Sequence, residues 1–179
     1  MNNKSTTLLH SIKDFYTQNE QNAKHLTDIL EKKNGISLRN IEWFITNHSK
    51  KTNFSYKTKD GRQFIVHCAY KSSLDGYSKK LFDPFCRTEK IEFEVPNSNV
   101  KVHTTVAQLN FIKWCIKNEI IDYLLQNKIT PKQLLIEFHH RFKSISNTMT
   151  LEAIDMLNRK GYKIFFISEL GREYSFIKN

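Results

Sequence analysis

The sequence predicts an α+β protein in which helices pack on an antiparallel sheet and a β-α-β-β unit follows. Three observations predict it. Apolar residues recur at helical spacing before residue 48 and after residue 105, whereas in between they alternate in short segments, strictly so over residues 91–95. Beyond Pro131 the pattern changes from strand to helix and back to two strands. With 39% hydrophobic and 12% aromatic residues among 179, the chain can bury a core.

Residues 5–33 are expected to be helical because apolar side chains recur at three- and four-residue spacing near both ends. The middle, residues 17–24, is almost wholly polar, so the pattern fits two short helices or one exposed helix. Gly35 ends this N-terminal helical segment, residues 1–35. A further helix is expected over residues 38–48.

The next part of the chain has the period of strands. Asp60-Gly61 lies between two alternating segments, which is typical of a β-hairpin, and Pro96 opens a second turn. The expected strands are residues 53–58, 63–70, 91–95 and 100–103. We expect them to form one central antiparallel meander of about four strands.

Residues 105–127 form the clearest predicted helix. Thr105 and Gln108 fit a capping box, in which each side chain bonds the backbone N–H of the other residue. The apolar face is wider than a solvent-facing helix needs, so Phe111 and Trp114 are expected in the core, with the helix packed on the sheet.

Pro131, in a polar stretch, marks the boundary of a C-terminal unit over residues 131–179, after an α+β domain over residues 36–127. Its expected elements are a strand at 134–139, a helix at 150–160, and strands at 163–168 and 173–178. Leu151, Ile154 and Leu157 are expected to face inward. Such an isolated unit exposes strand edges, which favours docking on the rest of the chain or on another subunit.

The charge is strongly positive. With 28 Lys and Arg against 18 Asp and Glu the formal net charge is +10, which favours polyanionic partners such as nucleic acid. Residues 48–90 alone hold ten cations and four acids. A lysine-rich composition can also produce such an excess without any ligand.

The segment Tyr70–Arg87 sets four cations among four aromatic rings, with Gly76 and Pro84 expected to interrupt regular structure. Cations that hold phosphates beside rings on which bases stack are typical of nucleic-acid binding. The candidate binding residues are Lys71, Tyr77, Lys79, Lys80 and Arg87. Two alternatives stay open. The segment could be a surface loop whose aromatics anchor it to the core, or Phe82-Asp-Pro-Phe85 could recruit a protein partner.

Catalytic signatures are sparse. Glu137 and His139 would share one face of a strand and could act as base and orienter, or form a buried hydrogen-bonded pair. Isolated glycines exclude a P-loop and a dinucleotide fingerprint, and no spacing typical of a zinc site occurs. We therefore expect no catalytic residue, no metal and no cofactor.

Three cysteines, odd in number and widely spaced, favour reduced thiols in an intracellular compartment over a disulfide framework. Charged residues interrupt the start of the chain, so no secretory leader is expected, and the apolar runs are too short to span a bilayer. The expected partners are nucleic acid, and a protein partner or a second copy of the chain, but no membrane.

Two family resemblances add to this interpretation. Pro131-Lys-Gln-Leu-Leu-Ile-Glu-Phe-His-His-Arg-Phe142, Gly161-Tyr-Lys-Ile-Phe-Phe-Ile-Ser168 and Glu173-Tyr-Ser-Phe-Ile177 resemble the C-terminal end of FkbM-type methyltransferases. That resemblance implies the last strand-helix-hairpin of a Rossmann-like fold. It makes Glu137 and His139 a remnant of a substrate pocket. The family's S-adenosylmethionine site would lie upstream, where no glycine-rich turn occurs.

The part of the chain from about residue 36 to residue 127 resembles an uncharacterised family of nucleocytoplasmic large DNA viruses, related to iridovirus immediate-early proteins. The matching residues are Asn40-Ile-Glu-Trp-Phe-Ile-Thr-Asn-His-Ser-Lys-Lys51, the segment Tyr70–Arg87, and Thr104-Thr-Val-Ala-Gln-Leu-Asn-Phe-Ile-Lys-Trp114. The resemblance implies an intracellular viral protein, in the host cytoplasm or a viral factory, and brings no catalytic residues.

The expected function is therefore a basic accessory protein that binds nucleic acid weakly and without sequence preference. The alternatives are a protein-interaction module, or a fragment or subunit of an FkbM-type methyltransferase. The chain alone is not expected to transfer methyl groups.

Overall fold

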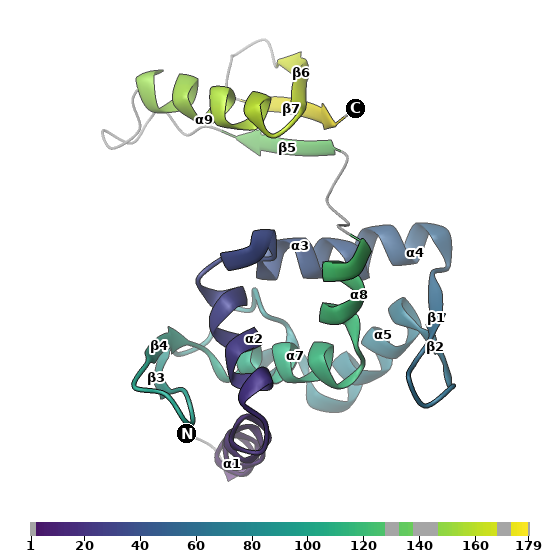
Figure 1. Ribbon diagram of the computed structural model, residues 1–179, viewed down its shortest axis with the longest axis vertical. Helices are drawn as coiled ribbons and strands as arrows, with labels where there is room; N and C mark the ends of the chain where they lie inside the picture. Colours follow the sequence, from purple (N-terminus) through teal and green to yellow (C-terminus); the bar gives the residue numbers. More distant parts are fainter. Residues whose placement is uncertain (1–2, 128–132, 138–146, 168–172, 179) are drawn as a thin grey trace. The chain divides into compact units, whose positions relative to one another are not determined.

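The computed structural model describes residues 3–127, 133–137, 147–167 and 173–178, which divide into two compact units, Met1–Ile129 and Thr130–Asn179. The first unit is mainly helical (Figure 1). Its helices are α1 (Asn3–Thr17), α2 (Glu20–Leu30), α3 (Leu38–Trp43), α4 (Ser49–Thr52), α5 (Val66–Tyr77), α6 (Lys79–Phe82), α7 (Val106–Lys117) and α8 (Ile120–Asn127). Its strands are β1 (Ser55–Lys57), β2 (Gln63–Ile65), β3 (Ile91–Glu94) and β4 (Lys101–Thr104).

The N-terminal segment forms two helices, so the two-helix alternative is confirmed. Asn19 separates them because its side chain accepts a hydrogen bond from the Gln21 backbone N–H, 2.8 Å away, and caps α2. Both helices bury apolar residues in the core, and the buried Tyr16 hydroxyl donates to the Leu109 carbonyl oxygen at 3.1 Å. Gly35 ends a short 3-10 turn, η1 (Lys33–Gly35), with φ +74°, a conformation that glycine adopts without strain.

The helix predicted over residues 38–48 is present, but its second half is a π-helical turn, η2 (Phe44–His48). In a π-helix the hydrogen bonds skip one residue further, which frees backbone groups for other partners. The carbonyl oxygen of Ile45 lies 3.3 Å from Nδ1 of His67 on α5. A contact from this π-helical turn therefore connects the end of α3 to α5.

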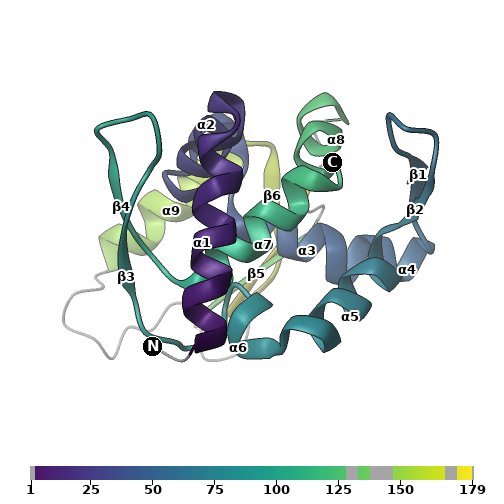
Figure 2. The same ribbon diagram turned by 90° about the horizontal axis from the view of Figure 1, so that it is seen from below.

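Helix α7 lies near the middle of the first unit in both views (Figures 1 and 2). Thr105 caps it as expected, because its Oγ1 accepts from the Gln108 N–H at 3.2 Å. The Gln108 side chain does not complete the capping box. It accepts from the Thr104 hydroxyl at 2.8 Å and donates to the Pro84 carbonyl at 3.2 Å. Glu119, with φ +61°, then separates α7 from α8, so the single helix predicted over residues 105–127 is wrong.

The prediction of one central four-stranded sheet is also wrong. Within the described ranges β1 pairs only with β2 and β3 only with β4, both antiparallel. The two hairpins lie at opposite sides of the first unit in both views (Figures 1 and 2). Helices rather than strands fill the core between them, so α7 packs on helices and not on a sheet.

The strand predicted over residues 63–70 ends at Ile65, where α5 begins. Val66 and Tyr70 are buried and Leu74 packs against the core, so the apolar residues recur every four positions along one helical face. That four-residue spacing indicates a helix, although the residues just before it form strand β2.

The second unit contains β5 (Gln133–Glu137), α9 (Asn147–Arg159), β6 (Tyr162–Ile167) and β7 (Glu173–Lys178), in the predicted order strand, helix, strand, strand. Strand β7 lies between β5 and β6 and is antiparallel to both. Leu157 is buried, but Leu151 is 66% exposed, contrary to the prediction. Successive steps of three residues drift around a helix, so Leu151 and Leu157 lie about 120° apart.

Candidate nucleic-acid interface

The basic segment Tyr70–Arg87 is largely helical, which corrects the expectation that Gly76 interrupts regular structure. Gly76 lies inside α5, one residue before its end, and α6 follows after Ser78 alone. A glycine costs about 1 kcal/mol within a helix and is tolerated there when neighbouring contacts compensate. Ser78 has φ +74° and ψ 153°, a backbone conformation that residues with side chains rarely adopt.

The four aromatic rings of this segment divide into two pairs. Tyr70 is 8% exposed and Phe82 is completely buried, whereas Tyr77 and Phe85 are 41% and 40% exposed. Phe82 contacts the rings of Tyr70, Phe111 and Trp114. The segment is therefore anchored to the core by two rings and presents the other two at the surface.

This division bears on the protein-recruitment alternative. Of the two phenylalanines in Phe82-Asp-Pro-Phe85, only Phe85 reaches the surface. The guanidinium carbon of Arg39, on α3, lies 4.2 Å from the centre of the Phe85 ring, which is a cation–π contact. Arg39 therefore adds a cation beside this exposed ring that the sequence pattern did not indicate.

The Tyr77 ring stacks on Phe82. Their centres are 5.5 Å apart and their planes differ by 11°. Because Phe82 is buried and held on other sides by core rings, it supports Tyr77 from beneath. The turn at Ser78, between the two helices, brings these residues together.

The candidate cations are all exposed, but they differ in their surroundings. Lys79 lies 3.7 Å from the Asp83 carboxylate, whereas the part of the chain that the structure describes offers Lys71, Lys80 and Arg87 no acidic partner. Lys79 and Lys80 begin α6 directly after Tyr77 and Ser78, so the structure groups these three candidates. Lys71 lies six residues before Tyr77 on α5, about 9 Å along the helix and on another side of it.

A pocket of about 690 Å³ lies between α1 and the junction of α5 with α6. We call it the Tyr77 pocket. It is lined by Lys4, Thr7, Leu8, Ser11, Asp75, Gly76, Tyr77, Ser78 and Leu81. Sequence analysis missed the contribution of α1, because nothing local indicates that residues about seventy positions apart meet.

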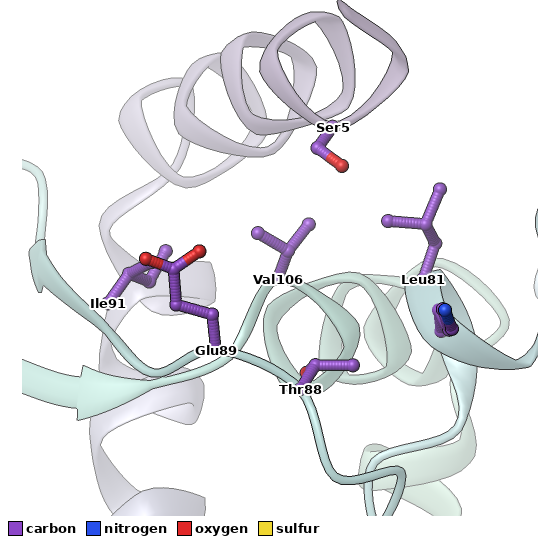
Figure 3. Close-up of a pocket in the computed structure, with 7 residues that line it drawn as sticks. Ser5, Leu81, Thr88, Glu89, Ile91 and Val106 are labelled. Atoms are coloured by element: carbon purple, nitrogen blue, oxygen red, sulfur yellow. The ribbon is translucent and has the colours of Figure 1, made fainter. Parts of the chain in front are cut away.

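A second pocket of about 230 Å³, the Thr88 pocket, shares Leu81 with the first and is lined by Ser5, Lys80, Leu81, Thr88, Glu89, Ile91 and Val106. Leu81 and Val106 point toward α1, which carries Ser5 on the opposite wall (Figure 3). Lys80 therefore lies beside the smaller pocket, and Tyr77 lines the larger one.

Lys113 of α7 holds the wall of the Tyr77 pocket that α1 provides. Its ammonium lies 2.9 Å from both the carbonyl oxygen and the Oγ of Ser11, and 5.6 Å from the Phe15 ring centre. Partial burial, and next the nearby Lys117, lower the pKa of Lys113 from its ordinary value. Burial, followed by the nearby carboxylates of Asp83 and Glu42, raises the pKa of the Tyr70 hydroxyl to about 12, so it stays protonated at neutral pH.

The second candidate pair falls at the edge of what the structure describes. Glu137 ends β5 opposite Glu173 of β7 in the strand register. His139, expected on the same strand face, lies outside the described residues. Among the residues that the structure describes, no three His, Cys, Asp or Glu side chains are grouped so that they could hold a metal ion. No helix in the same ranges is long and apolar enough to cross a membrane.

The fold and the surface define a basic α+β protein, and comparison with known proteins supplies its family. Residues 1–166 match DUF7197, a family of unknown function, and the chain belongs to that family. The match covers the first unit and the second unit as far as β6.

A relative occurs in a virus. The chain is 33% identical over 168 residues to an uncharacterised protein of Acanthamoeba polyphaga mimivirus. The aligned region covers 85% of this chain and 65% of the mimivirus protein. The chain thus spans about two thirds of that relative's length. No solved structure matches the chain. The predicted resemblance to an uncharacterised viral family is confirmed at this level, whereas the resemblance to FkbM-type methyltransferases stays a prediction.

Proposed function

We propose that this chain is a virus-type accessory protein of the intracellular compartment that binds nucleic acid weakly and without strong sequence preference. The binding surface is formed by α5, α6 and the segment that continues to Arg87. The observation that carries the proposal is the pairing of two exposed rings, Tyr77 and Phe85, with exposed cations that lack acidic partners in the described parts of the chain.

The physical argument rests on complementarity with a polyphosphate chain. Lysine and arginine side chains that neutralise phosphates release condensed counterions, which provides affinity irrespective of sequence. Exposed rings stack on any base, because every base has a flat face. Arg39 beside Phe85 and Lys80 close to Tyr77 place a cation near each ring.

The test is a titration of labelled single- and double-stranded oligonucleotides at low and at physiological salt. We expect binding at low salt that weakens steeply with added salt. Replacing both Lys80 and Arg87 by glutamine is expected to weaken binding and to reduce the slope of log K against log salt by about 1.4 to 1.8.

The matched control is Lys101→Gln. It removes one positive charge at a lysine that Glu92 and Glu94 already neutralise, at 2.9 and 3.4 Å. It is expected to leave affinity and salt slope close to those of the unmodified chain. Absence of binding at low salt, or equal affinity of the double variant, would refute the proposal.

A second candidate is that the chain forms part of an S-adenosylmethionine-dependent methyltransferase of FkbM type. One observation favours it. Strands β5 and β6 are both antiparallel to β7 and hence parallel to each other, with α9 connecting them. Parallel strands joined by a helix are the building unit of Rossmann-like sheets. Calorimetric titration with S-adenosylmethionine tests this candidate. Saturable micromolar binding would support it, and no heat of binding would refute cofactor binding by this chain alone.

A further inference from the structure

We propose that the Tyr77 pocket binds one unpaired base of a single-stranded nucleic acid, stacked on the Tyr77 ring. This inference rests on the proposed function and specifies its ligand. A protein with such a pocket binds single strands in preference to duplexes, because a base within a duplex is already stacked and paired. A base must leave the stack before it can enter a pocket in a protein.

The Tyr77 ring is suited to be such a platform because its position is determined before any ligand binds. One face stacks on Phe82, which core rings hold on its other sides. The helices α5 and α6 fix the backbone on either side of the turn at Ser78. A ring already held in its binding position loses little freedom when a base stacks on it.

The pocket is large enough to admit a base, and its lining suits one. Its volume of about 690 Å³ lies within the range of small-ligand pockets, roughly 300–1,000 Å³. Leu8, Leu81 and the Tyr77 ring supply flat and apolar contacts. Ser11 and Ser78 line the same space. The Ser78 hydroxyl, and the Ser11 hydroxyl beside its bond from Lys113, can hydrogen-bond the edge of a base.

The charges decide which part of a nucleotide enters the pocket. Asp75 lines it and has no ion-pair partner among the described residues, so its carboxylate disfavours a phosphate directly beside it. A carboxylate instead accepts hydrogen bonds from the amino group of a base. Lys4 on α1, together with Lys79 and Lys80 on α6, places cations on both sides for the flanking phosphates.

The experiment compares three ligands on the full chain at low salt: a single-stranded oligonucleotide, an abasic strand of the same length, and the duplex. We expect the base-containing single strand to bind about tenfold more tightly than the abasic strand, in the range of base–aromatic stacking. The duplex is expected to bind no more tightly than the abasic strand at equal phosphate concentration.

Variants assign the effect to the pocket. Tyr77→Ala is expected to lose most of the preference for base-containing strands and to keep only what stacking on Phe85 contributes, whereas Tyr77→Phe keeps the preference because it keeps the ring. Phe85→Ala removes the other exposed ring, which does not line the pocket, and is expected to keep the preference for bases. If Tyr77→Ala does not fold, Phe85→Ala decides the question: loss of the base preference in that variant, which keeps Tyr77, overturns the pocket.

The outcomes separate this inference from the function on which it rests. Salt-dependent binding with equal affinity for base-containing and abasic strands overturns the base pocket and the stacking role of both rings, and leaves only the binding to phosphates. A base preference that is undiminished in folded Tyr77→Ala also overturns the pocket. Absence of binding to all three ligands at low salt overturns both.

Discussion

The side-chain amide of Asn110 on α7 donates a hydrogen bond to the carbonyl oxygen of Leu81 on α6, at 3.0 Å. Asn110 is buried between Leu109 and Phe111, which are themselves buried. Gln108 makes the neighbouring link to the Pro84 carbonyl. The central helix thus holds the backbone of the proposed binding surface with two side-chain hydrogen bonds, and the positions of Lys79, Lys80 and Tyr77 depend on it.

Asn110→Ala is expected to lower the free energy of unfolding by about 1–3 kcal/mol. The substitution removes a buried donor and leaves the Leu81 carbonyl without it. Urea denaturation followed by circular dichroism measures the change. The control is Asn99→Ala in the exposed turn between β3 and β4, where the expected change is within about 0.5 kcal/mol. Equal effects of the two substitutions would show that the buried bond contributes nothing.

Ser78→Gly is expected to stabilise the protein by about 1 kcal/mol. Ser78 adopts φ +74° and ψ 153°, which costs a residue with a side chain on the order of 1–3 kcal/mol. Glycine relieves this cost but gains freedom in the unfolded chain, which offsets part of the benefit. Thermal and urea denaturation measure the difference.

The control for that substitution is Ser72→Gly, at an exposed position of α5. There the backbone is helical, so glycine is expected to destabilise by about 0.5–1 kcal/mol. The strain argument fails if both serine-to-glycine substitutions change stability in the same direction.

Stability is expected to fall above about pH 9. Burial raises the pKa of the Cys115 thiol well above 9.0 and that of the Tyr16 hydroxyl well above 10.0. In the unfolded chain both groups lose their protons near the ordinary values, while the folded chain retains them. Protons bound only by the folded state make stability decrease as pH rises, by about 1.4 kcal/mol per pH unit for each group.

Tyr16→Phe isolates the contribution of the Tyr16 hydroxyl. It removes the hydrogen bond to Leu109, which lowers stability at neutral pH by about 1 kcal/mol. It also removes one titrating group, so the decline above pH 10 is expected to be shallower than in the unmodified chain. Tyr77→Phe, the same substitution at an exposed tyrosine, serves as the control. Parallel alkaline curves for all three proteins would contradict the assignment.

Ser49→Ala is expected to leave stability unchanged or to raise it by up to about 1 kcal/mol. The Ser49 hydroxyl is fully buried at the start of α4, and the described residues offer it no hydrogen-bond partner. Removing a buried polar atom that lacks a partner removes its desolvation penalty. A loss of more than 1 kcal/mol in urea denaturation would mean that this hydroxyl is hydrogen-bonded in solution.

Local signals in the sequence were reliable where they depend on neighbouring residues. Asp60-Gly61 predicted the β1–β2 hairpin, Thr105 the start of α7, and the polar stretch around Asn19 one of the two arrangements of the N-terminal helices. The cations and rings of the candidate interface could be named from the sequence, but not which of the rings are exposed. Its wall from α1 was not, because no pattern within a segment indicates which distant segment will pack against it.

The sequence by itself determined the kinds of element, the positive charge and the residue types available for binding. These follow from backbone propensities, turn chemistry and composition, which act over a few residues. Only the tertiary structure decided that the strands remain two separate hairpins, that Phe82 is buried while Tyr77 is exposed, and that α1 closes a pocket beside that ring. The reason is physical: burial of the wide apolar face of α7 selects which surfaces meet, and that selection depends on the whole core at once.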